Sequence, residues 1–336
     1  MPRARPMPVK AGDVINRRWV VVDLLGEGGC GSVWRCRHLR RPDEEIALKV
    51  LENLADEDRF RRERQILQQV HSPFVIRLLD SGRHENFPFL ALEFMAGGSL
   101  RDLLDRRKRL PVAEAAWALV MTIRGLLAAR TVHRDLKPEN LLLTRPGGRR
   151  GEVRLIPGDY RRGSCVKVAD FGLAKAWDPS MTKLTKTGQV MGTPLYMSPE
   201  QCRNTRDVTV QCDIYALGVM LYEMTVGAPP FDADNAYDLM HKHCHAPVPR
   251  APGVEERVQA VIERCMAKNP DERYRTLREL ERELATLAGL DARGARIERG
   301  AAGWSLWTWV MLIAGLAAFV AIAWILRDEL RRALGL

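Results

Sequence analysis

The sequence predicts an α+β protein with two lobes, a small β-rich lobe followed by a larger helical one, and one C-terminal transmembrane helix. Three observations support this prediction. Short β-branched strands flank a glycine-rich loop near the N-terminus, helical periodicity dominates residues 99–288, and residues 304–326 carry no charge. With 336 residues, 46% apolar and 28% charged, the chain has the composition of a globular protein.

The smaller lobe is predicted from runs of β-branched and apolar residues that follow a flexible tail, residues 1–13. Strands are expected at residues 19–25, 33–38, 46–51 and 89–93, with a turn at residues 41–43. The first two strands enclose the glycine-rich loop, so they should form a hairpin. This differs from a dinucleotide-binding unit, in which the glycines open a helix.

A lysine lies within the apolar third strand. Alternation places Ile46 and Val50 on one face and Lys49 on the other. A lysine in such a strand needs a counter-charge or an anionic ligand. Glu63 falls on the apolar stripe of the helix expected at residues 56–70, so we expect the two charged groups to meet. The alternative is a pair of separate surface charges.

The larger lobe is predicted from apolar residues at helical spacing. A flexible connector at residues 94–98 precedes it, and Ser99 lies near the N-cap of its first helix. Further helices are expected at residues 111–130, 208–226, 236–245, 254–267 and 277–288.

Seven cysteines lie far apart without regular pairing, which favours a reducing compartment over a disulfide framework. His241, His243, Cys244 and His245 could be read as metal ligands. No second pair of ligands accompanies them. We interpret the cluster as a helix end with ordinary surface histidines and assign no metal site to it.

The glycine-rich loop has the pattern G-x-G-x-x-G-x-V. Its residues are Gly26, Glu27, Gly28, Gly29, Cys30, Gly31, Ser32 and Val33. Missing side chains let backbone N–H groups approach phosphate oxygens closely. The pattern alone is weak evidence, because glycines also occur in ordinary turns, but the valine and the later Lys49 strengthen it.

Residues His133-Arg134-Asp135-Leu136-Lys137-Pro138-Glu139-Asn140 resemble the catalytic loop of eukaryotic-type serine/threonine protein kinases. Asp170-Phe171-Gly172 resembles the metal-binding motif of that family, and Ser198-Pro199-Glu200 resembles the end of its activation segment. The resemblance covers about residues 14–288 and implies the bilobal protein-kinase fold. Its parts would be an N-lobe at 14–93, a hinge at 94–98 and a C-lobe at 99–288.

The resemblance also assigns roles to the polar residues. Asp135 would accept the proton of the substrate hydroxyl, and Lys137 would neutralise the transferring phosphoryl group. Asn140 and Asp170 would hold Mg²⁺, with Mn²⁺ as an alternative ion. ATP would be bound by the glycine-rich loop together with Ala47, Lys49, Glu63, Glu93 and Met95.

Supporting roles follow in the same way. Asp213 would brace the backbone of the catalytic loop, and Arg273 would pair with Glu200. We further expect autophosphorylation of the activation segment at Thr185 or Thr187.

The segment between Asn140 and Asp170 contains a basic insert at about residues 145–164. A tolerated surface loop is the simpler interpretation of this insert. The alternative is docking to an acidic partner or to the membrane surface.

Residues 304–326 are 23 positions without a charge, which as a helix measure roughly 35 Å and can cross a bilayer. Tryptophans lie near both ends, as at membrane interfaces. We therefore expect a single-pass membrane protein, as in bacterial membrane-anchored members of the family, with a juxtamembrane linker at 289–303 and a short tail at 327–336. Ala314 and Ala318 have the spacing of a small-residue helix contact, which is weak evidence for a homodimer.

The resemblance implies a serine/threonine protein kinase that uses ATP and acts on protein substrates with Ser or Thr hydroxyls. ATP is cytosolic, so the kinase domain should face the cytoplasm. The alternative is a pseudokinase that serves as a nucleotide-dependent scaffold, but Lys49, Asp135, Asn140 and Asp170 are all present. The net charge of +10 suits acidic partners, although the scattered arginines predict no nucleic-acid partner.

Overall fold

The computed structural model describes residues 9–28, 31–53, 56–146, 152–171, 194–203 and 208–290. All of them belong to one compact unit that spans Met1–Ala295. The predicted transmembrane helix at 304–326 and the tail at 327–336 lie outside the described residues, as does most of the predicted linker at 289–303.

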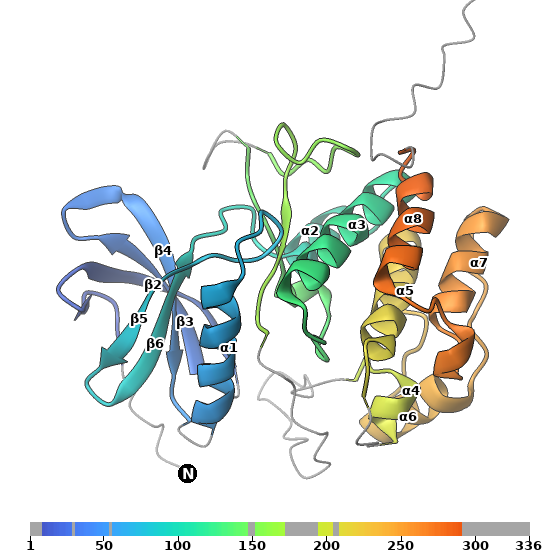
Figure 1. Ribbon diagram of the computed structural model, residues 1–336, viewed down its shortest axis with the longest axis horizontal. Coiled ribbons are helices and arrows are strands. Elements are labelled where there is room, and N and C mark those ends of the chain that lie inside the picture. The colour runs from blue at the N-terminus through green and yellow to red at the C-terminus, as the bar shows by residue number, and fades with distance from the viewer. Residues whose placement is uncertain are drawn as a thin grey trace, which may run out of the picture. The chain divides into compact units, whose positions relative to one another are not determined.

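The N-terminal lobe is an antiparallel sheet of six strands in the order β1-β2-β3-β4-β6-β5. The strands are β1 (Val14–Ile15), β2 (Trp19–Gly28), β3 (Gly31–His38), β4 (Arg41–Leu51), β5 (Leu78–His84) and β6 (Phe87–Glu93). One helix, α1 (Glu57–Gln69), packs beside the sheet (Figure 1). The four predicted strands are therefore present, and the structure adds β1 and β5.

The predicted turn at residues 41–43 is wrong, because the chain reverses earlier and β4 already begins at Arg41. The Nδ1 atom of His38 accepts hydrogen bonds from the backbone N–H groups of Arg40 and Arg41, which closes a tight turn. Pro42 is tolerated in the strand because β4 pairs with β6 only from Ile46 onward, so this part of β4 lies at an edge.

The C-terminal lobe is mainly helical (Figure 1). Its helices are α2 (Leu100–Arg107), α3 (Val112–Ala129), α4 (Pro199–Cys202), α5 (Gln211–Val226), α6 (Ala236–His245), α7 (Glu256–Cys265) and α8 (Leu277–Leu287). Two short strands, β7 (Leu141–Leu143) and β8 (Val166–Val168), form an antiparallel pair, and two 3₁₀ turns, η2 (Pro138–Asn140) and η5 (Pro270–Glu272), complete the lobe. Ser99 caps α2 as predicted, because its side chain accepts a hydrogen bond from the N–H of Asp102.

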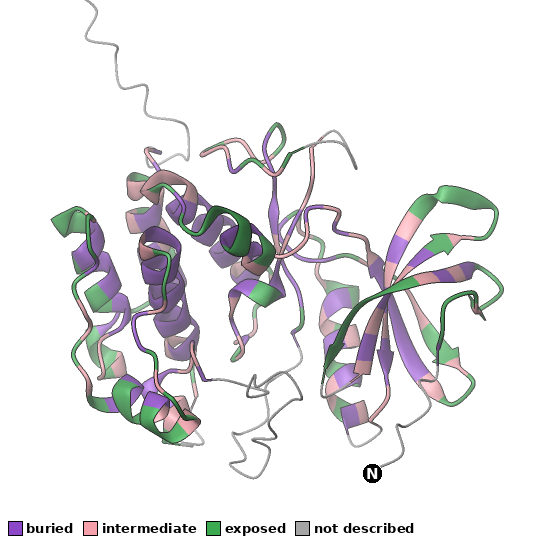
Figure 2. Cartoon of the chain, turned by 180° about the vertical axis from the view of Figure 1, so that it is seen from behind, coloured by how far each residue is buried: buried purple, intermediate pink, exposed green. Residues whose placement is uncertain are grey.

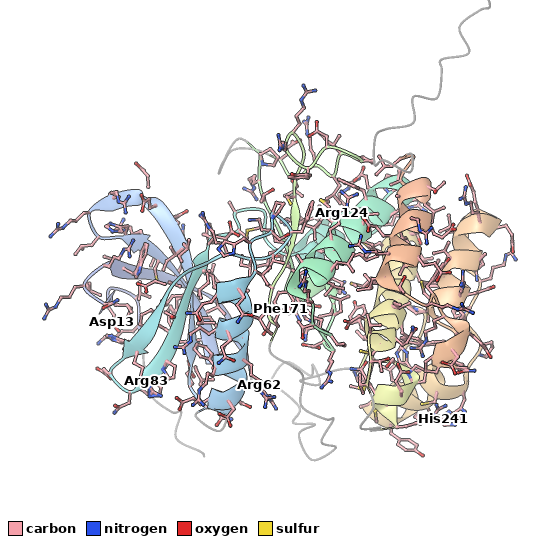
Figure 3. The ribbon with its side chains drawn as sticks, viewed as in Figure 1. Asp13, Arg62, Arg83, Arg124, Phe171 and His241 are labelled. Atoms are coloured by element: carbon pink, nitrogen blue, oxygen red, sulfur yellow. The ribbon has the colours of Figure 1, made fainter. Side chains whose placement is uncertain are left out.

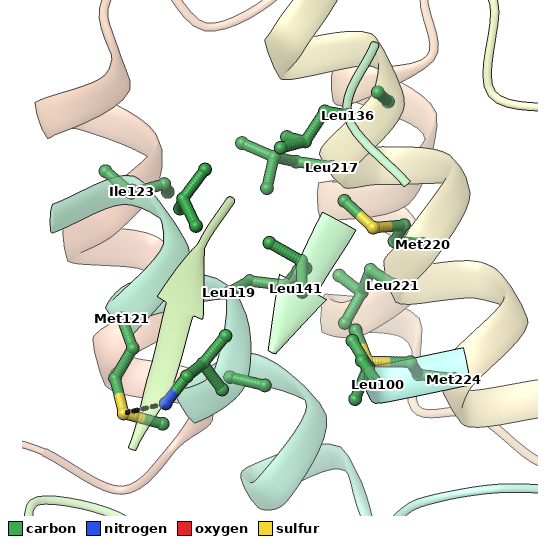
Figure 4. Close-up of a cluster of buried hydrophobic side chains, with 14 of the residues drawn as sticks. Leu100, Leu119, Met121, Ile123, Leu136, Leu141, Leu217, Met220, Leu221 and Met224 are labelled. Atoms are coloured by element: carbon green, nitrogen blue, oxygen red, sulfur yellow. Dashed lines mark hydrogen bonds between the residues drawn. The ribbon is translucent and has the colours of Figure 1, made fainter. Parts of the chain in front are cut away.

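Helices α3 and α5 form the centre of this lobe and are buried along most of their length (Figure 2). Among the described residues, α3 is the one helix long and apolar enough to cross a membrane, and 61% of it is buried inside the lobe. Its apolar composition is therefore that of a core helix. The segment at residues 133–143, called the catalytic segment below, contributes Leu136 and Leu141 to the same apolar cluster beside α3 and α5 (Figure 4).

The basic insert between β7 and β8 is anchored to the lobe rather than lying on its surface as a simple loop. Leu155 is 4% exposed and belongs to the main apolar cluster. The ring of Tyr160 packs edge-on against Phe74 with centroids 5.0 Å apart. The N–H of Ser164 donates to the carbonyl of Arg154, and the N–H of Arg154 donates to the hydroxyl of Ser164, so the middle of the insert is joined to its C-terminal end.

His243 is not a surface residue, so our interpretation of the histidine cluster is wrong at this position. Its side chain is buried, with Nδ1 2.9 Å from the Tyr215 hydroxyl and the ring 5.1 Å from Phe231. Burial, together with the charge of Lys268, lowers the pKa of His243 to about 3. His241, on the same helix, is exposed (Figure 3).

Acidification should therefore destabilise the domain through His243. The unfolded chain takes up a proton at this residue near pH 6.5, whereas the folded chain takes it up only near pH 3, so stability falls with pH between these values. At pH 5 this proton uptake lowers the free energy of unfolding by about 2 kcal/mol.

We expect the His243→Gln variant to be less stable than wild type at pH 7. Between pH 7 and pH 5, its free energy of unfolding should fall by about 2 kcal/mol less than that of wild type, measured by urea denaturation of residues 1–290. His241→Gln is the matched control and should keep the wild-type pH dependence. Identical pH dependence in wild type and His243→Gln would contradict this prediction.

Candidate active site

Lys49 on β4 binds two carboxylates that come from different parts of the chain. Its Nζ lies 2.9 and 2.7 Å from the two carboxylate oxygens of Glu63 on α1. The same Nζ lies 2.9 Å from Oδ1 of Asp170, which follows β8. The predicted meeting of Lys49 and Glu63 is therefore confirmed, and Asp170 joins it.

The pKa shifts of Lys49, Glu63 and Asp170 arise because the two carboxylates share the one ammonium group of Lys49. Burial alone would lower the pKa of Lys49, but the charges of Asp170 and Glu63 outweigh it and raise the pKa. Lys49 lowers the pKa of Asp170. Burial raises the pKa of Glu63 against the opposing effect of Lys49. Asp170 therefore remains the firmly ionised acid of the pair at neutral pH.

Three polar side chains of the catalytic segment surround one another. Oδ2 of Asp135 lies 2.8 Å from Nζ of Lys137 and 3.3 Å from Nδ2 of Asn140. The amide of Asn140 also donates to the backbone carbonyl of Asp135 at 2.7 Å. Leu136 is 2% exposed and anchors the segment in the core. Charged groups in the loop are thus held in place by an apolar side chain between them.

The Lys49 cluster and the catalytic segment are electrostatically connected. Burial would lower the pKa of Lys137, but Asp135 raises it, and Asp170 contributes in the same direction. Nε2 of His133 lies 3.0 Å from the carbonyl of Ala169, next to Asp170. The ring of His133 lies 5.2 Å from that of Phe171, which lies between the two lobes in Figure 3.

Two residues of the site have left-handed backbone conformations, Arg134 with φ of 66° and Asp170 with φ of 61°. Such conformations are costly for residues with side chains and persist only where neighbours hold them. The buried carboxylate of Asp213 accepts from the N–H groups of His133 at 2.8 Å and Arg134 at 2.9 Å. This is the brace that the family resemblance implied.

Sequence reasoning missed Gln201, whose Nε2 donates to the carbonyl of Arg134 at 2.7 Å. It also missed Arg101 on α2. The guanidinium of Arg101 binds Glu139 of the catalytic segment at 3.1 Å and Glu223 of α5 at 2.9 Å, and it also binds the Tyr196 hydroxyl. No local pattern marks these residues, because their partners are distant in sequence.

The described part of the glycine-rich loop lies where β2 turns into β3. Gly26, Glu27 and Gly28 are exposed on β2. A side chain at Gly31 would place its Cβ 1.9 Å from the carbonyl oxygen of Val50, so this position requires glycine. Gly29 and Cys30 lie outside the described residues.

The last two loop residues differ in how they are used. The hydroxyl of Ser32 is buried, donates to Glu52 at 2.5 Å and accepts from Trp34 at 2.9 Å. Its side chain is thus engaged inside the lobe and not free for a ligand. Val33 is half-buried and lies opposite Lys49 in the β3–β4 pairing.

The residues expected at the adenine end lie around the end of β6. Ala47 is half-buried opposite Leu92, and Met95 is buried. Oε1 of Glu93 accepts from Lys167 Nζ at 2.6 Å and from the N–H of Arg77 at 2.8 Å. The side chain of Glu93 is therefore used within the protein, and so is its backbone N–H, which donates to the carbonyl of Arg77 at 3.0 Å.

Glu200 and Arg273 form the expected pair, with two parallel contacts of 2.8 and 2.9 Å. Burial would raise the pKa of Glu200, but its hydrogen bonds and charge interaction with Arg273 lower it. The pair ties α4 to the segment after α7. A bidentate arginine–carboxylate contact is a strong and orientation-specific anchor.

The donor atoms at Asp170 and Asn140 fit a hard cation. Mg²⁺ prefers oxygen ligands and is commonly held by one or two protein groups together with substrate phosphates. Asp170 offers a carboxylate that is 48% exposed, and Asn140 offers an amide oxygen. In the described ranges no three His, Cys, Asp or Glu side chains cluster as a complete metal site. Thr185 and Thr187 lie outside the described residues.

A family model described as the protein kinase domain matches residues 19–283. The chain belongs to the protein kinase family. It is 33% identical over 273 residues to the serine/threonine-protein kinase PknL of Mycobacterium tuberculosis. The aligned region covers 78% of this chain and 63% of that protein. It is 30% identical over 298 residues to the probable serine/threonine-protein kinase PknB of Lactococcus lactis, covering 85% of this chain and 44% of that protein. It is 30% identical over 292 residues to PrkC of Bacillus subtilis, covering 83% and 42%.

The kinase family predicted from the motifs is therefore confirmed. The matched part of the chain spans between 42% and 63% of the length of these relatives.

Proposed function

We propose that this kinase transfers the γ-phosphate of ATP to Ser and Thr hydroxyls of protein substrates. The observation that carries the proposal is the arrangement of two groups of charged side chains. Glu63 and Asp170 bind Lys49, and Asp135 binds Lys137. Asp170 also raises the pKa of Lys137. Phosphoryl transfer needs placement of positive charge and one proton acceptor more than covalent chemistry. The names of the three relatives support Ser and Thr as the acceptor residues.

Each of these charged residues has a distinct task in this proposal. Asp135 is 45% exposed, so its carboxylate can reach a substrate hydroxyl and take its proton. Lys137, held against Asp135, supplies positive charge to the phosphoryl oxygens. Lys49 binds the α- and β-phosphates, and Glu63 keeps the ammonium in position.

Asp170 and Asn140 would hold Mg²⁺, which neutralises the negative charge that develops on the phosphates. The glycine-rich loop would cover the phosphates with backbone N–H groups. Ala47, Glu93 and Met95 would line the adenine end, Glu93 through its backbone.

Replacing the acceptor carboxylate should slow transfer strongly without unfolding the domain. We expect Asp135→Asn to lower the rate of [γ-³²P]ATP incorporation into a protein substrate by about 10²- to 10⁴-fold, because the amide cannot accept the proton. Asp43→Asn, an exposed position on β4, is the matched control and should retain wild-type activity. Equal label incorporation in wild type and Asp135→Asn would favour the alternative of a pseudokinase scaffold.

The activation segment is proposed to carry the regulatory phosphate at Thr185 or Thr187. Arg134 precedes the catalytic acid, and its side chain is exposed, with one long contact of 3.4 Å to the carbonyl of Val208. A phosphate dianion could therefore bind the guanidinium of Arg134 and order the segment.

Peptide mapping after incubation with ATP and Mg²⁺ should find phosphate on Thr185 or Thr187. The double substitution Thr185→Ala/Thr187→Ala should remove it and lower activity, whereas Ser180→Ala should change neither. Modification confined to Ser180, or none at all, would refute this assignment.

Membrane anchoring by residues 304–326 completes the proposal, with the kinase domain (14–288) in the cytoplasm, joined through the linker at 289–303. The support is the uncharged run of membrane-spanning length. A homodimer through Ala314 and Ala318 remains a secondary part of this proposal.

The full chain should remain in the membrane pellet after alkaline carbonate extraction, because its apolar segment lies in the bilayer. Residues 1–303 should be released into the supernatant. Release of the full chain under the same conditions would disprove the anchor while leaving the catalytic proposal intact.

A further inference from the structure

The basic insert between β7 and β8 is a positively charged feature that the proposed function leaves unused. Residues 145–164 contain six arginines and two acidic residues, which gives the insert a net charge of +4. Its described part presents Arg154, Arg161 and Arg162, which are all exposed. The side chain of Arg162 is 88% exposed and that of Arg154 is 70% exposed.

A short turn fixes the backbone that carries two of these arginines. The carboxylate of Asp159 accepts from the N–H groups of Arg161 at 3.1 Å and Arg162 at 3.0 Å. Tyr160, between them in sequence, packs its ring on Phe74 inside the domain. Arg161 and Arg162 are therefore held at the surface by a defined turn with an aromatic anchor.

The ion pairs within the insert leave its arginines available to an external anion. Arg154 pairs with Glu152 at 3.0 Å, and both side chains are largely exposed. Nε of Arg162 lies 3.6 Å from the carboxylate of Asp159, which the turn already uses. Ion pairs between exposed groups contribute little free energy, because water competes for both partners. An external anion can therefore replace these pairs at small cost.

The insert lies on the side of the C-terminal lobe where the chain leaves the domain. Figure 1 and Figure 2 both show the insert and the C-terminal end of α8 on the same side of this lobe. Side-chain contacts connect the two regions. Tyr160 packs on Phe74, the guanidinium of Arg124 on α3 lies 5.9 Å from the Phe74 ring, and Arg124 binds Glu281 of α8 at 2.8 Å.

The proposed membrane anchor begins close to this side of the domain. The described chain ends at Leu290, and the uncharged run begins at Trp304. The linker between them, residues 291–303, can extend over at most roughly 45 Å. A tether this short gives an effective concentration on the order of millimolar near the bilayer, so a weak attraction is enough for docking. The inference below rests on this proposed anchor.

The chemistry of the insert favours a lipid surface over a protein partner. Each arginine close to an anionic bilayer strengthens the attraction by about fivefold. The arginine fork also matches the phosphate groups of lipid headgroups. The large apolar residues of the insert, Leu155 and Tyr160, are engaged inside the domain. The described part of the insert therefore offers charge rather than the aromatic anchors on which protein interfaces depend.

We propose that the insert docks on the anionic lipid headgroups of the membrane in which residues 304–326 are anchored. Arg161 and Arg162 contact the headgroup phosphates, with Arg154 beside them. Helices α4 and α6 lie on the opposite side of the C-terminal lobe from the insert (Figure 1). Docking thus turns these helices toward the cytoplasm and fixes the orientation in which the domain meets its protein substrates.

The test uses the full chain reconstituted in nanodiscs, with hydrogen–deuterium exchange of the insert followed by mass spectrometry. The discs contain either phosphatidylcholine alone or phosphatidylcholine with about one-third phosphatidylserine. We expect the amides of residues 158–163 to exchange at least about fivefold more slowly in the discs with phosphatidylserine. The difference should disappear in about 0.5 M NaCl, which screens the attraction.

The double substitution Arg161→Gln/Arg162→Gln should remove most of the slowing, since each arginine contributes about fivefold. Arg61→Gln/Arg62→Gln is the matched control, because it replaces an exposed pair of neighbouring arginines on α1. Arg62 lies far from the insert in the view of Figure 3. The control should keep the lipid dependence of wild type. Circular dichroism melting verifies that each variant is folded.

Equal exchange of residues 158–163 in the two kinds of disc would overturn the docking, as would an unchanged lipid dependence in Arg161→Gln/Arg162→Gln. Co-elution of the chain with phosphatidylcholine discs tests the anchor separately. Retention in these discs together with equal exchange refutes the docking alone, whereas failure to co-elute refutes the anchor and the docking with it. The exchange needs no ATP, so none of these results bears on the catalytic proposal.

Discussion

The arrangement of this domain depends on one ammonium group that must be neutralised in a partly buried site. Lys49 is placed on the inner side of β4 by strand alternation, and its side chain is 19% exposed. Glu63 and Asp170 provide the compensating charge, and Asp170 lies 121 positions further along the chain. A lysine in this environment would be costly without such partners. Its neutralisation therefore joins the sheet, α1 and the end of β8 at one point.

The catalytic segment must hold many polar groups next to an apolar core. Leu136, Leu141 and Leu143 anchor it from within the core, and Asp213 holds its backbone from α5. The left-handed conformations of Arg134 and Asp170 persist because neighbours hold both residues: the N–H of Arg134 donates to Asp213, and the carboxylate of Asp170 accepts from Lys49. Packing around the segment thus supports the orientation of Asp135, Lys137 and Asn140.

Helix α1 connects the functional regions of the N-terminal lobe. One face presents Glu63 to Lys49, and another face borders a cavity lined by Arg61, Arg64 and Arg83. The segment after its C-terminal end is fixed to the other lobe, because the N–H of Val168 donates to the carbonyl of Phe74 at 2.9 Å and Tyr160 of the insert packs on the Phe74 ring. The insert therefore supports the same connection that positions α1.

The sequence by itself determined the features that depend on neighbouring residues. Periodicity placed α6 at its observed bounds and put Glu63 on the buried face of α1, and unbroken motifs identified the kinase family and the polar residues of the site. Only the tertiary structure decided the polar edge strand β5, the burial of His243, the anchoring of the insert through Leu155, and the bracing of the catalytic segment by Gln201 and Arg101. These features rest on contacts between residues far apart in the chain. Local propensity and spacing carry no information about such contacts, because burial and pairing are properties of the packed molecule.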